Sequence, residues 1–265
     1  MRLHGRKALV IGGSSGIGAA IARRFAREGA AVGVVASRDE SKAAAVAAGI
    51  QADGGTAHAF AADVADRTAL GTLVAAAIDR LGAVDILVNS AGVYFQTPVG
   101  TTPAADVDRM VDINVKGPFH AVDAVAPHMI ARGSGKIINL ASASGFRGAP
   151  GYTLYAATKA AIVMMTRSLA CDLAPHGINV NAVAPGNTAT PMNENIRTRP
   201  EFAENLALRR ALTPSGRTYS EADDMAAAAL FLASDDSRAM HGATLLLDEG
   251  STAGAFFARD RYLQG

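Results

Sequence analysis

The sequence predicts an α/β fold in which a doubly wound sheet of seven mainly parallel strands carries helices on both faces. Short runs rich in valine and isoleucine recur along the chain, and many are apolar on both faces, as expected of strands buried between two helical layers. Segments of helical length separate these runs, and no linker or internal repeat interrupts the alternation. We therefore expect a single domain over residues 1–265, with strands at 7–11, 31–36, 56–61, 84–89, 136–140, 178–183 and 243–247.

Local signals mark where the predicted helices begin and end. Ser41 and Asp66 stand near helix starts, because their side-chain oxygens can accept hydrogen bonds from the free N–H groups of a first turn. Gly29, Gly82 and Gly177 stand just past helix ends, where a left-handed residue commonly closes the last turn. Strand and helix therefore alternate from the first strand onward.

Two segments depart from this alternation. Residues 186–220 are interrupted by prolines and begin at the carboxyl end of a strand, where doubly wound folds bind ligands, so we expect a substrate lid there. The tail 251–265 extends past the pattern, and its Phe256, Phe257 and Tyr262 are expected to cover either an active site or a subunit interface. The sequence does not distinguish these two placements.

Composition disfavours several classes of partner. A formal net charge of +1 gives no broad basic surface of the kind that neutralises nucleic-acid phosphates. No apolar run approaches the roughly 20 residues that a membrane span needs, so we expect a cytoplasmic protein with neither a nucleic-acid nor a membrane partner. The six histidines include no close metal-ligating pair, and we expect no metal in the chemistry.

A glycine-rich loop follows the first predicted strand and leads directly into a helix. Glycines let the backbone turn tightly and approach a pyrophosphate, whose charge is favoured by the N–H groups and dipole of the following helix. Such a loop in this context indicates a Rossmann-like dinucleotide site, although a glycine-rich turn can also be purely structural. The residues expected to contact the cofactor here are Gly12, Ser14, Ser15, Gly16, Ile17 and Gly18.

Two further strand ends are expected to converge on the same crevice. Asp63 and Val64 follow the third strand, where a carboxylate can accept a hydrogen bond from an adenine amino group. Asn89, Ala91 and Gly92 lie at the end of the fourth strand, beside the expected cofactor. The alternatives are that Asp63 caps a turn and that Asn89 stabilises a loop.

A possible catalytic set comprises four polar residues in three segments. Tyr155 and Lys159 stand four apart in a helical run, so their side chains share one face of the helix. Ser142 follows the fifth strand, and Asn114 completes the set. Taken one at a time, these residues could be a half-buried aromatic, a solvated lysine, a helix cap and a helix irregularity.

Together with the glycine loop, these residues resemble the short-chain dehydrogenase/reductase family, from about residue 6 to 250. The resemblance implies an NAD(P)-dependent oxidoreductase with Asn114, Ser142, Tyr155 and Lys159 as its catalytic residues. Members that act as 3-oxoacyl-carrier-protein reductases and sugar dehydrogenases are the most similar in pattern. The resemblance also implies a homotetramer, for which the apolar helical stretches 107–130 and 156–173 would supply contact faces.

The segment 185–192 is similar to the family's nicotinamide-contacting loop. The resemblance places Pro185, Gly186, Thr188 and Thr190 on the cofactor. Two departures stand out, because the family often has threonine where this chain has Ile11 and a second asparagine where it has Ser90. Neither change removes a reacting group.

The chemistry expected of the four side chains is proton transfer beside a hydride transfer. A tyrosine ionises near pH 10, and a neighbouring ammonium such as Lys159 would favour its phenolate form. In reduction, Tyr155 would donate a proton to a carbonyl oxygen while Ser142 stabilises the developing negative charge. Asn114 would hold a water that relays protons through Lys159, and nicotinamide would carry out the hydride step.

The end of the second strand predicts a preference for NADP over NAD. An NAD-selective site places a carboxylate here, whereas this chain has Ala36 followed by Ser37 and Arg38, which suit a 2′-phosphate. Against this preference, the acidic residues at 39 and 40 could turn inward. Ser15 also stands where many NADP-using relatives carry a second basic residue.

The substrate is expected to be a small carbonyl or alcohol compound, and its identity stays open. The expected pocket residues are Ser144, Tyr94, Gln96, Tyr152, Asn187 and Met192. Four arginines of the lid, at 197, 199, 209 and 210, are interpreted as a solvated helix face, with binding of a substrate anion as the alternative.

Two rival functions remain at this stage. A non-catalytic dinucleotide sensor could use the same fold without turnover. A 3-oxoacyl-carrier-protein reductase would need a basic docking surface, which Arg132, Lys136 and His176 match only in part.

Overall fold

The computed structural model describes residues 1–254, and within them seven strands form one parallel sheet in the order β3-β2-β1-β4-β5-β6-β7. This confirms the predicted fold class, and the strands match the predicted runs to within two residues. Phe256, Phe257 and Tyr262 of the tail lie outside the described residues. The strands are β1 (Lys7–Ile11), β2 (Ala31–Ala36), β3 (Thr56–Ala61), β4 (Ile86–Asn89), β5 (Gly135–Leu140), β6 (Ile178–Pro185) and β7 (Thr244–Leu247).

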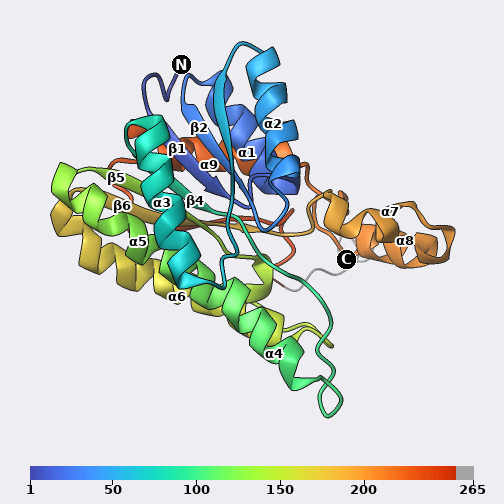
Figure 1. The fold of residues 1–265 in the computed structure, drawn as a ribbon. Coiled ribbons are helices and arrows are strands. Elements are labelled where there is room, and N and C mark those ends of the chain that lie inside the picture. The colour runs from blue at the N-terminus through green and yellow to red at the C-terminus, as the bar shows by residue number, and fades with distance from the viewer. Residues whose placement is uncertain (255–265) are drawn as a thin grey trace.

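Helices cover both faces of the sheet (Figure 1). Successive residues of β1 point to opposite sides, so Val10 joins the core under one helical layer while Leu9 and Ile11 join the core under the other. The first layer contains α1 (Gly16–Arg27), α2 (Glu40–Ala52) and α9 (Ala222–Ala233), and the second contains α3 (Arg67–Leu81), α5 (Gly117–Arg132) and α6 (Thr153–Leu173).

Helix boundaries follow the predicted capping chemistry with one correction. The carboxylate of Asp66 accepts hydrogen bonds from Thr68 and Ala69 and so begins α3 as expected. The helix predicted to start near Ser41 instead begins at Glu40, because the carboxylate of Asp39 accepts the Ser41 N–H at 3.1 Å. This contact makes Asp39 a helix cap.

The strand order reverses beside β1, which pairs with β2 on one side and β4 on the other. The connections that follow β1 and β4 run to opposite faces of the sheet and leave a crevice at the carboxyl ends of the strands, the usual ligand site of doubly wound sheets. Between β4 and β5, α4 (Ala104–Val111) runs through a π-helical turn, Asp112–Lys116, into α5. Such turns are rare and often occur at functional sites.

The excursion over 186–220 projects away from the sheet beside the crevice (Figure 1). It contains the turns Pro191–Asn193 and Pro200–Phe202 and the short helices α7 (Glu194–Thr198) and α8 (Ala203–Ala211). Neither helix buries a residue, and the base of the excursion is closed by a bridge between Thr188 and Ser220. Its role as a substrate lid stays a prediction.

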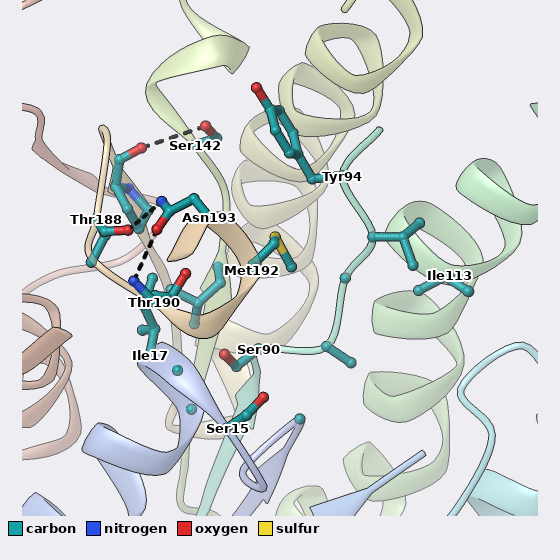
Figure 2. A pocket seen from close by; sticks show the side chains of 18 of the residues that line it. Ser15, Ile17, Ser90, Tyr94, Ile113, Ser142, Thr188, Thr190, Met192 and Asn193 are labelled. Carbon is teal, nitrogen blue, oxygen red and sulfur yellow. Dashed lines mark hydrogen bonds between the residues drawn. The ribbon is translucent and has the colours of Figure 1, made fainter. Parts of the chain in front are cut away.

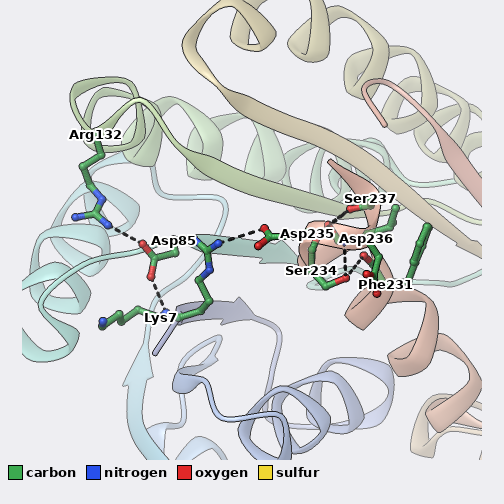
Figure 3. Close-up of polar contacts among 10 residues, drawn as sticks. Lys7, Asp85, Arg132, Phe231, Ser234, Asp235, Asp236 and Ser237 are labelled. Carbon is green, nitrogen blue, oxygen red and sulfur yellow. Dashed lines mark hydrogen bonds and ion pairs between the residues drawn. The ribbon is translucent and has the colours of Figure 1, made fainter. Parts of the chain in front are cut away.

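Ion pairs join the elements at the opposite, amino-terminal edge of the strands (Figure 3). Asp85 accepts the Lys7 N–H at 2.8 Å and forms an ion pair with Arg132 at 2.8 Å. Arg6 forms an ion pair with Asp235 at 3.2 Å. One of the three basic residues that could serve as a carrier-protein docking surface, Arg132, is therefore neutralised within the fold.

Two kinds of feature are absent from residues 1–254. No helix in this part of the chain is long and apolar enough to cross a membrane. The same residues contain no group of three or more side chains suited to hold a metal ion.

Candidate active site

A cavity of about 630 Å³ lies at the carboxyl ends of the strands and joins the glycine loop to the candidate catalytic residues. Figure 2 shows Ser15 and Ile17 at one end of this cavity and Tyr94 at the other. Every residue proposed from the sequence to bind the cofactor lines it except Asn89. Three distant segments of the sequence therefore meet in one cavity, as the strand-end argument predicts.

The glycine loop is shaped to bring backbone close to a phosphate group. A Cβ on Gly12 would lie 2.5 Å from the backbone nitrogen of Ala91, and one on Gly18 would overlap the carbonyl oxygen of Gly12. Ser15 precedes α1 without a side-chain capping bond, so the helix N-terminus is left to a ligand. The loop and the cavity therefore fit a dinucleotide.

Arg38 and Asp63 line the cavity and pair with each other. Arg38 donates from Nη2 at 2.9 Å and from Nε at 3.2 Å to one carboxylate oxygen of Asp63. The other oxygen accepts the Ala65 N–H at 3.0 Å. Asp63 therefore stabilises a turn, the role given above as the alternative to adenine binding. Asp63 also lines the cavity. These hydrogen bonds lower the pKa of Asp63.

Asn89 belongs to a buried polar chain that the sequence analysis missed. It donates to the side chain of its register partner Asn139 at 2.9 Å, and Asn139 donates to Thr166 on α6 at 3.0 Å. Buried amides need such partners, and this chain ties β4 and β5 to the helix that carries Tyr155. The contacts of Asn89 therefore fit a stabilising role, the alternative to cofactor binding. Its neighbour Ser90 lines the cavity instead.

The candidate catalytic side chains Ser142, Tyr155 and Lys159 all line the cavity. Tyr155 and Lys159 lie one turn apart on α6, and the Lys159 ammonium is 5.8 Å from the centre of the Tyr155 ring. Ser142 follows β5, caps a short turn by accepting the Ser144 N–H at 3.2 Å, and lies within 3.4 Å of the Pro185 carbonyl oxygen (Figure 2). Helix α6 and the ends of β5 and β6 thereby bring the three groups together.

The environment of Tyr155 differs from the sequence-based expectation. Burial raises the pKa of Tyr155, and a hydrogen bond with Ser142 opposes that rise. The expected lowering by Lys159 does not dominate, because desolvation disfavours the phenolate. A tyrosine that holds its proton at neutral pH suits a proton donor to a carbonyl oxygen.

Asn114 is buried in the π-helical turn and does not line the cavity. Its side-chain oxygen accepts the Val93 N–H at 2.8 Å, and its amide donates to the Val93 carbonyl at 2.9 Å and to Thr158 at 3.3 Å. These contacts occupy the amide that was expected to hold a water. They also fix the chain around Gly92, where a Cβ would lie 3.3 Å from Asn114 Oδ1 and 3.7 Å from Lys159 Nζ.

Lys159 is 6% exposed, and burial lowers its pKa to about 8. Its ammonium donates to the Leu140 carbonyl at 2.8 Å, with no carboxylate beside it to compensate for desolvation. Relative to an unfolded value near 10.4, this shift corresponds to a cost of about 3 kcal/mol at neutral pH. The side chain therefore destabilises the fold at pH 7.

Lys159→Met is accordingly expected to raise the melting temperature at pH 7. Below pH 8 the desolvation cost is fully present in the unmodified protein. Between pH 8 and 10 the unfolded chain holds more protons at this site than the folded chain, so the unmodified protein gains stability as the pH rises. The gap in melting temperature between Lys159→Met and the unmodified protein therefore closes. Thermal unfolding at several pH values measures the gap, and the exposed Lys42→Met is the matched control. A gap that does not change with pH contradicts this account.

The predicted substrate pocket is largely assembled around stacked tyrosines. Tyr94 stacks on Tyr152 with ring centres 4.7 Å apart, and its edge meets Tyr155 at 4.8 Å. Ser144, Asn187 and Met192 also line the cavity, whereas Gln96 lies outside it, beside Gly151. Burial and the neighbouring tyrosines raise the pKa of Tyr94, so its hydroxyl stays protonated.

Several lining residues were not proposed from the sequence. Ser90, Arg109, Arg147 and Tyr219 lie in loops or helices whose residue type alone gives no sign of the cavity. Arg209 was noted only within the basic group of the lid. Residue spacing gave no sign of Arg109 either, because Ile113, the lining residue four positions further on, was not itself predicted to face the cavity.

The fold and the cavity define a dinucleotide-binding protein with a tyrosine and a lysine at the reactive end. Residues 6–201 match the family model described as short chain dehydrogenase. The chain belongs to the short-chain dehydrogenase/reductase family, as its motifs predict, and is an NAD(P)-dependent oxidoreductase that acts on alcohol or carbonyl groups.

Individual relatives cover nearly the whole chain. A galactitol 2-dehydrogenase from Agrobacterium fabrum is 40% identical over 95% of this chain and 99% of its own. A 3-oxoacyl-[acyl-carrier-protein] reductase from Thermotoga maritima is 37% identical over 94% of this chain and 99% of its own. A gluconate 5-dehydrogenase from Burkholderia cenocepacia, solved in complex with NADP and tartrate, is 38% identical with a TM-score of 0.89, covering 96% of this chain and 98% of that one. These three names span neutral, acidic and carrier-bound substrates.

Proposed function

We propose that this protein is an NADP-preferring dehydrogenase of polyols or sugar acids in which Tyr155 is the general acid and base. The observation that carries the proposal is that Tyr155, Ser142 and Lys159 line the same cavity as the glycine loop. Ser142 binds the reacting oxygen, and Lys159 holds positive charge beside the tyrosine.

During oxidation of an alcohol, Tyr155 first releases its phenol proton to solvent, and its phenolate oxygen then accepts the hydroxyl proton of the substrate. Ser142 donates a hydrogen bond to the substrate oxygen and so steadies its charge as the carbonyl forms. The nicotinamide of a dinucleotide held by the glycine loop would supply the hydride chemistry in both directions. Buried Lys159 opposes the desolvation cost of a phenolate at Tyr155.

Asn114 takes a positioning role in this proposal. Its amide clamps both backbone groups of Val93, which holds Gly92 beside Lys159 Nζ. The water relay expected of Asn114 would need its backbone, because its side chain is committed to Val93 and Thr158.

The preference for NADP is supported by the end of β2. Ala36, Ser37 and Arg38 line the cavity, whereas the carboxylate of Asp39 caps α2. No acidic side chain from this strand end is among the described lining residues, so none repels a 2′-phosphate there. The relative from Burkholderia cenocepacia was solved with NADP.

The decisive experiment is a panel of polyols, sugar acids and the corresponding ketones, assayed with NADP(H) and NAD(H) at the absorbance band of the reduced nicotinamide. Turnover of at least one polyol or sugar acid with NADP supports the proposal. Failure of all these compounds beside turnover of a 3-oxoacyl thioester would replace it with the carrier-protein reductase function.

That second candidate is supported by the relative from Thermotoga maritima. The ion pair between Arg132 and Asp85 weakens its docking surface, which leaves Lys136 and His176 as the remaining basic groups. Family membership favours an enzyme over the non-catalytic sensor.

A homotetramer remains the prediction for the assembly. Phe119 on α5 is 46% exposed and Met164 on α6 is 57% exposed, and both lie in the apolar stretches expected to pair. Symmetric contacts would remove these side chains from water. Light scattering at micromolar concentration should therefore give about four times the chain mass of 27.1 kDa, and a monomer mass would refute the assembly. A cytoplasmic location likewise stays a prediction.

A further inference from the structure

The lining of the cavity carries more positive than negative charge. Arg109 on α4, Arg147 after the turn that Ser142 caps, and Arg209 on α8 all line the cavity. Among its described lining residues the one carboxylate is Asp63, which belongs to the cofactor end and pairs with Arg38. Three guanidinium groups from three separate segments thus surround one space.

None of the three arginines forms an ion pair within residues 1–254. Arg209 donates from Nε to Asn205 at 2.7 Å, and Arg147 donates from Nη1 to the Ser251 carbonyl at 3.0 Å. A guanidinium has five N–H donors, so these contacts orient the groups and leave most donors for a ligand. On the nearby π-helical turn, Asp112 is engaged by Lys116 at 2.7 Å.

Arg209 lines the same cavity as Tyr94 and Tyr155. Its charge acts on the Tyr94 hydroxyl, opposing the rise that burial causes in the pKa of Tyr94. The Tyr94 ring in turn meets Tyr155 edge-on at 4.8 Å. A group bound by Arg209 therefore lies in the cavity that also holds Tyr155.

Unpaired arginines that line one cavity favour the entry of an anion, and a planar guanidinium fits a carboxylate with two parallel hydrogen bonds. We propose that Arg109, Arg147 and Arg209 bind the carboxylate of a hydroxy-acid substrate, so that this enzyme acts on sugar acids in preference to neutral polyols. This inference rests on the proposed dehydrogenase function. It revises the solvated-face interpretation for Arg209.

Gluconate and sorbitol test the inference, because they share a six-carbon polyhydroxy chain and differ at C1 by a carboxylate or a CH₂OH group. The unmodified enzyme should show the higher kcat/KM with gluconate, and its KM for gluconate should rise with salt. Arg209→Gln should lower the ratio of kcat/KM for gluconate to kcat/KM for sorbitol by about tenfold to a hundredfold, mainly by raising the KM for gluconate.

The matched control is Arg210→Gln, the next residue on α8, whose Nε donates to the Gly216 carbonyl at 3.1 Å and which does not line the cavity. This variant should retain the gluconate preference. Equal or better use of sorbitol by the unmodified enzyme, or equal losses on both compounds in Arg209→Gln, overturns the inference and leaves the dehydrogenase function standing.

If neither compound is oxidised, calorimetric titration of gluconate into the protein with NADPH separates the two failures. Gluconate binding that is lost in Arg209→Gln and kept in Arg210→Gln supports the carboxylate site. The proposed dehydrogenase function is then the part that is wrong. Absence of binding to the unmodified protein overturns the inference as well.

Discussion

Replacement of Tyr155 by phenylalanine is expected to lower kcat by about a hundredfold or more. The change removes the hydroxyl that donates and accepts the substrate proton. It keeps the ring, whose edge contact with Tyr94 at 4.8 Å packs this part of the cavity. Far-UV circular dichroism and the Kd for NADPH should therefore change little, while turnover of the best substrate falls.

The matched control is Tyr152→Phe, which deletes a hydroxyl from the neighbouring ring of the same aromatic group. Tyr152 lines the cavity but has no part in the proposed proton transfer, so loss of its hydroxyl should affect KM more than kcat. Near-full turnover by Tyr155→Phe would show that another group transfers the proton. An equal fall in both variants would point to packing of the aromatic group instead.

The regular parts of the fold follow from hydrophobic pattern, and the deviations have local physical causes. β4 was expected from residue 84, but its register begins at Ile86; the backbone of Asp85 still bonds to Lys7 and Lys136 on either side. β6 continues beyond its predicted end to Pro185, whose register partner is Leu247. Pairing with a neighbouring strand, which a single run of residues does not reveal, sets both boundaries.

The site was predictable where backbone geometry dictates the residue type. Gly12 and Gly18 are required because a side chain at either would strike the neighbouring backbone. The one-turn spacing of Tyr155 and Lys159 likewise fixes their shared face. These positions are read from the sequence because local geometry alone determines them.

Polar residues with more than one available partner were harder to assign. Asn89 lies at the predicted strand end, yet its amide meets Asn139 across the sheet and does not line the cavity. Asp63 could serve adenine, a turn or a basic neighbour, and the folded chain satisfies it with Ala65 and Arg38. Such choices depend on distances between segments that lie far apart in the sequence.

The pairing of Arg38 with Asp63 gives the second large prediction, which concerns the choice of cofactor. Arg38→Ala is expected to lower kcat/KM with NADP by about tenfold to a hundredfold and to change the NAD value little. Charged hydrogen bonds to a phosphate contribute about 1.5 to 3 kcal/mol. The Arg38 side chain is 84% exposed, so solvent screening favours the lower end of this range.

A 2′-phosphate carries close to two negative charges and must compete with the single carboxylate of Asp63 for the same guanidinium. Asp63→Asn weakens that competitor and should raise the ratio of NADP to NAD efficiency, even where both values fall through a weaker contact with adenine. Fluorescence titration with NADPH and NADH gives the same comparison without turnover.

The control for Arg38→Ala is Arg67→Ala, which changes an exposed arginine that pairs with Asp123 at 2.8 Å and lies outside the cavity. A preference for NAD in the unmodified enzyme, or undiminished NADP efficiency in Arg38→Ala, would refute the assignment of Arg38 to the 2′-phosphate.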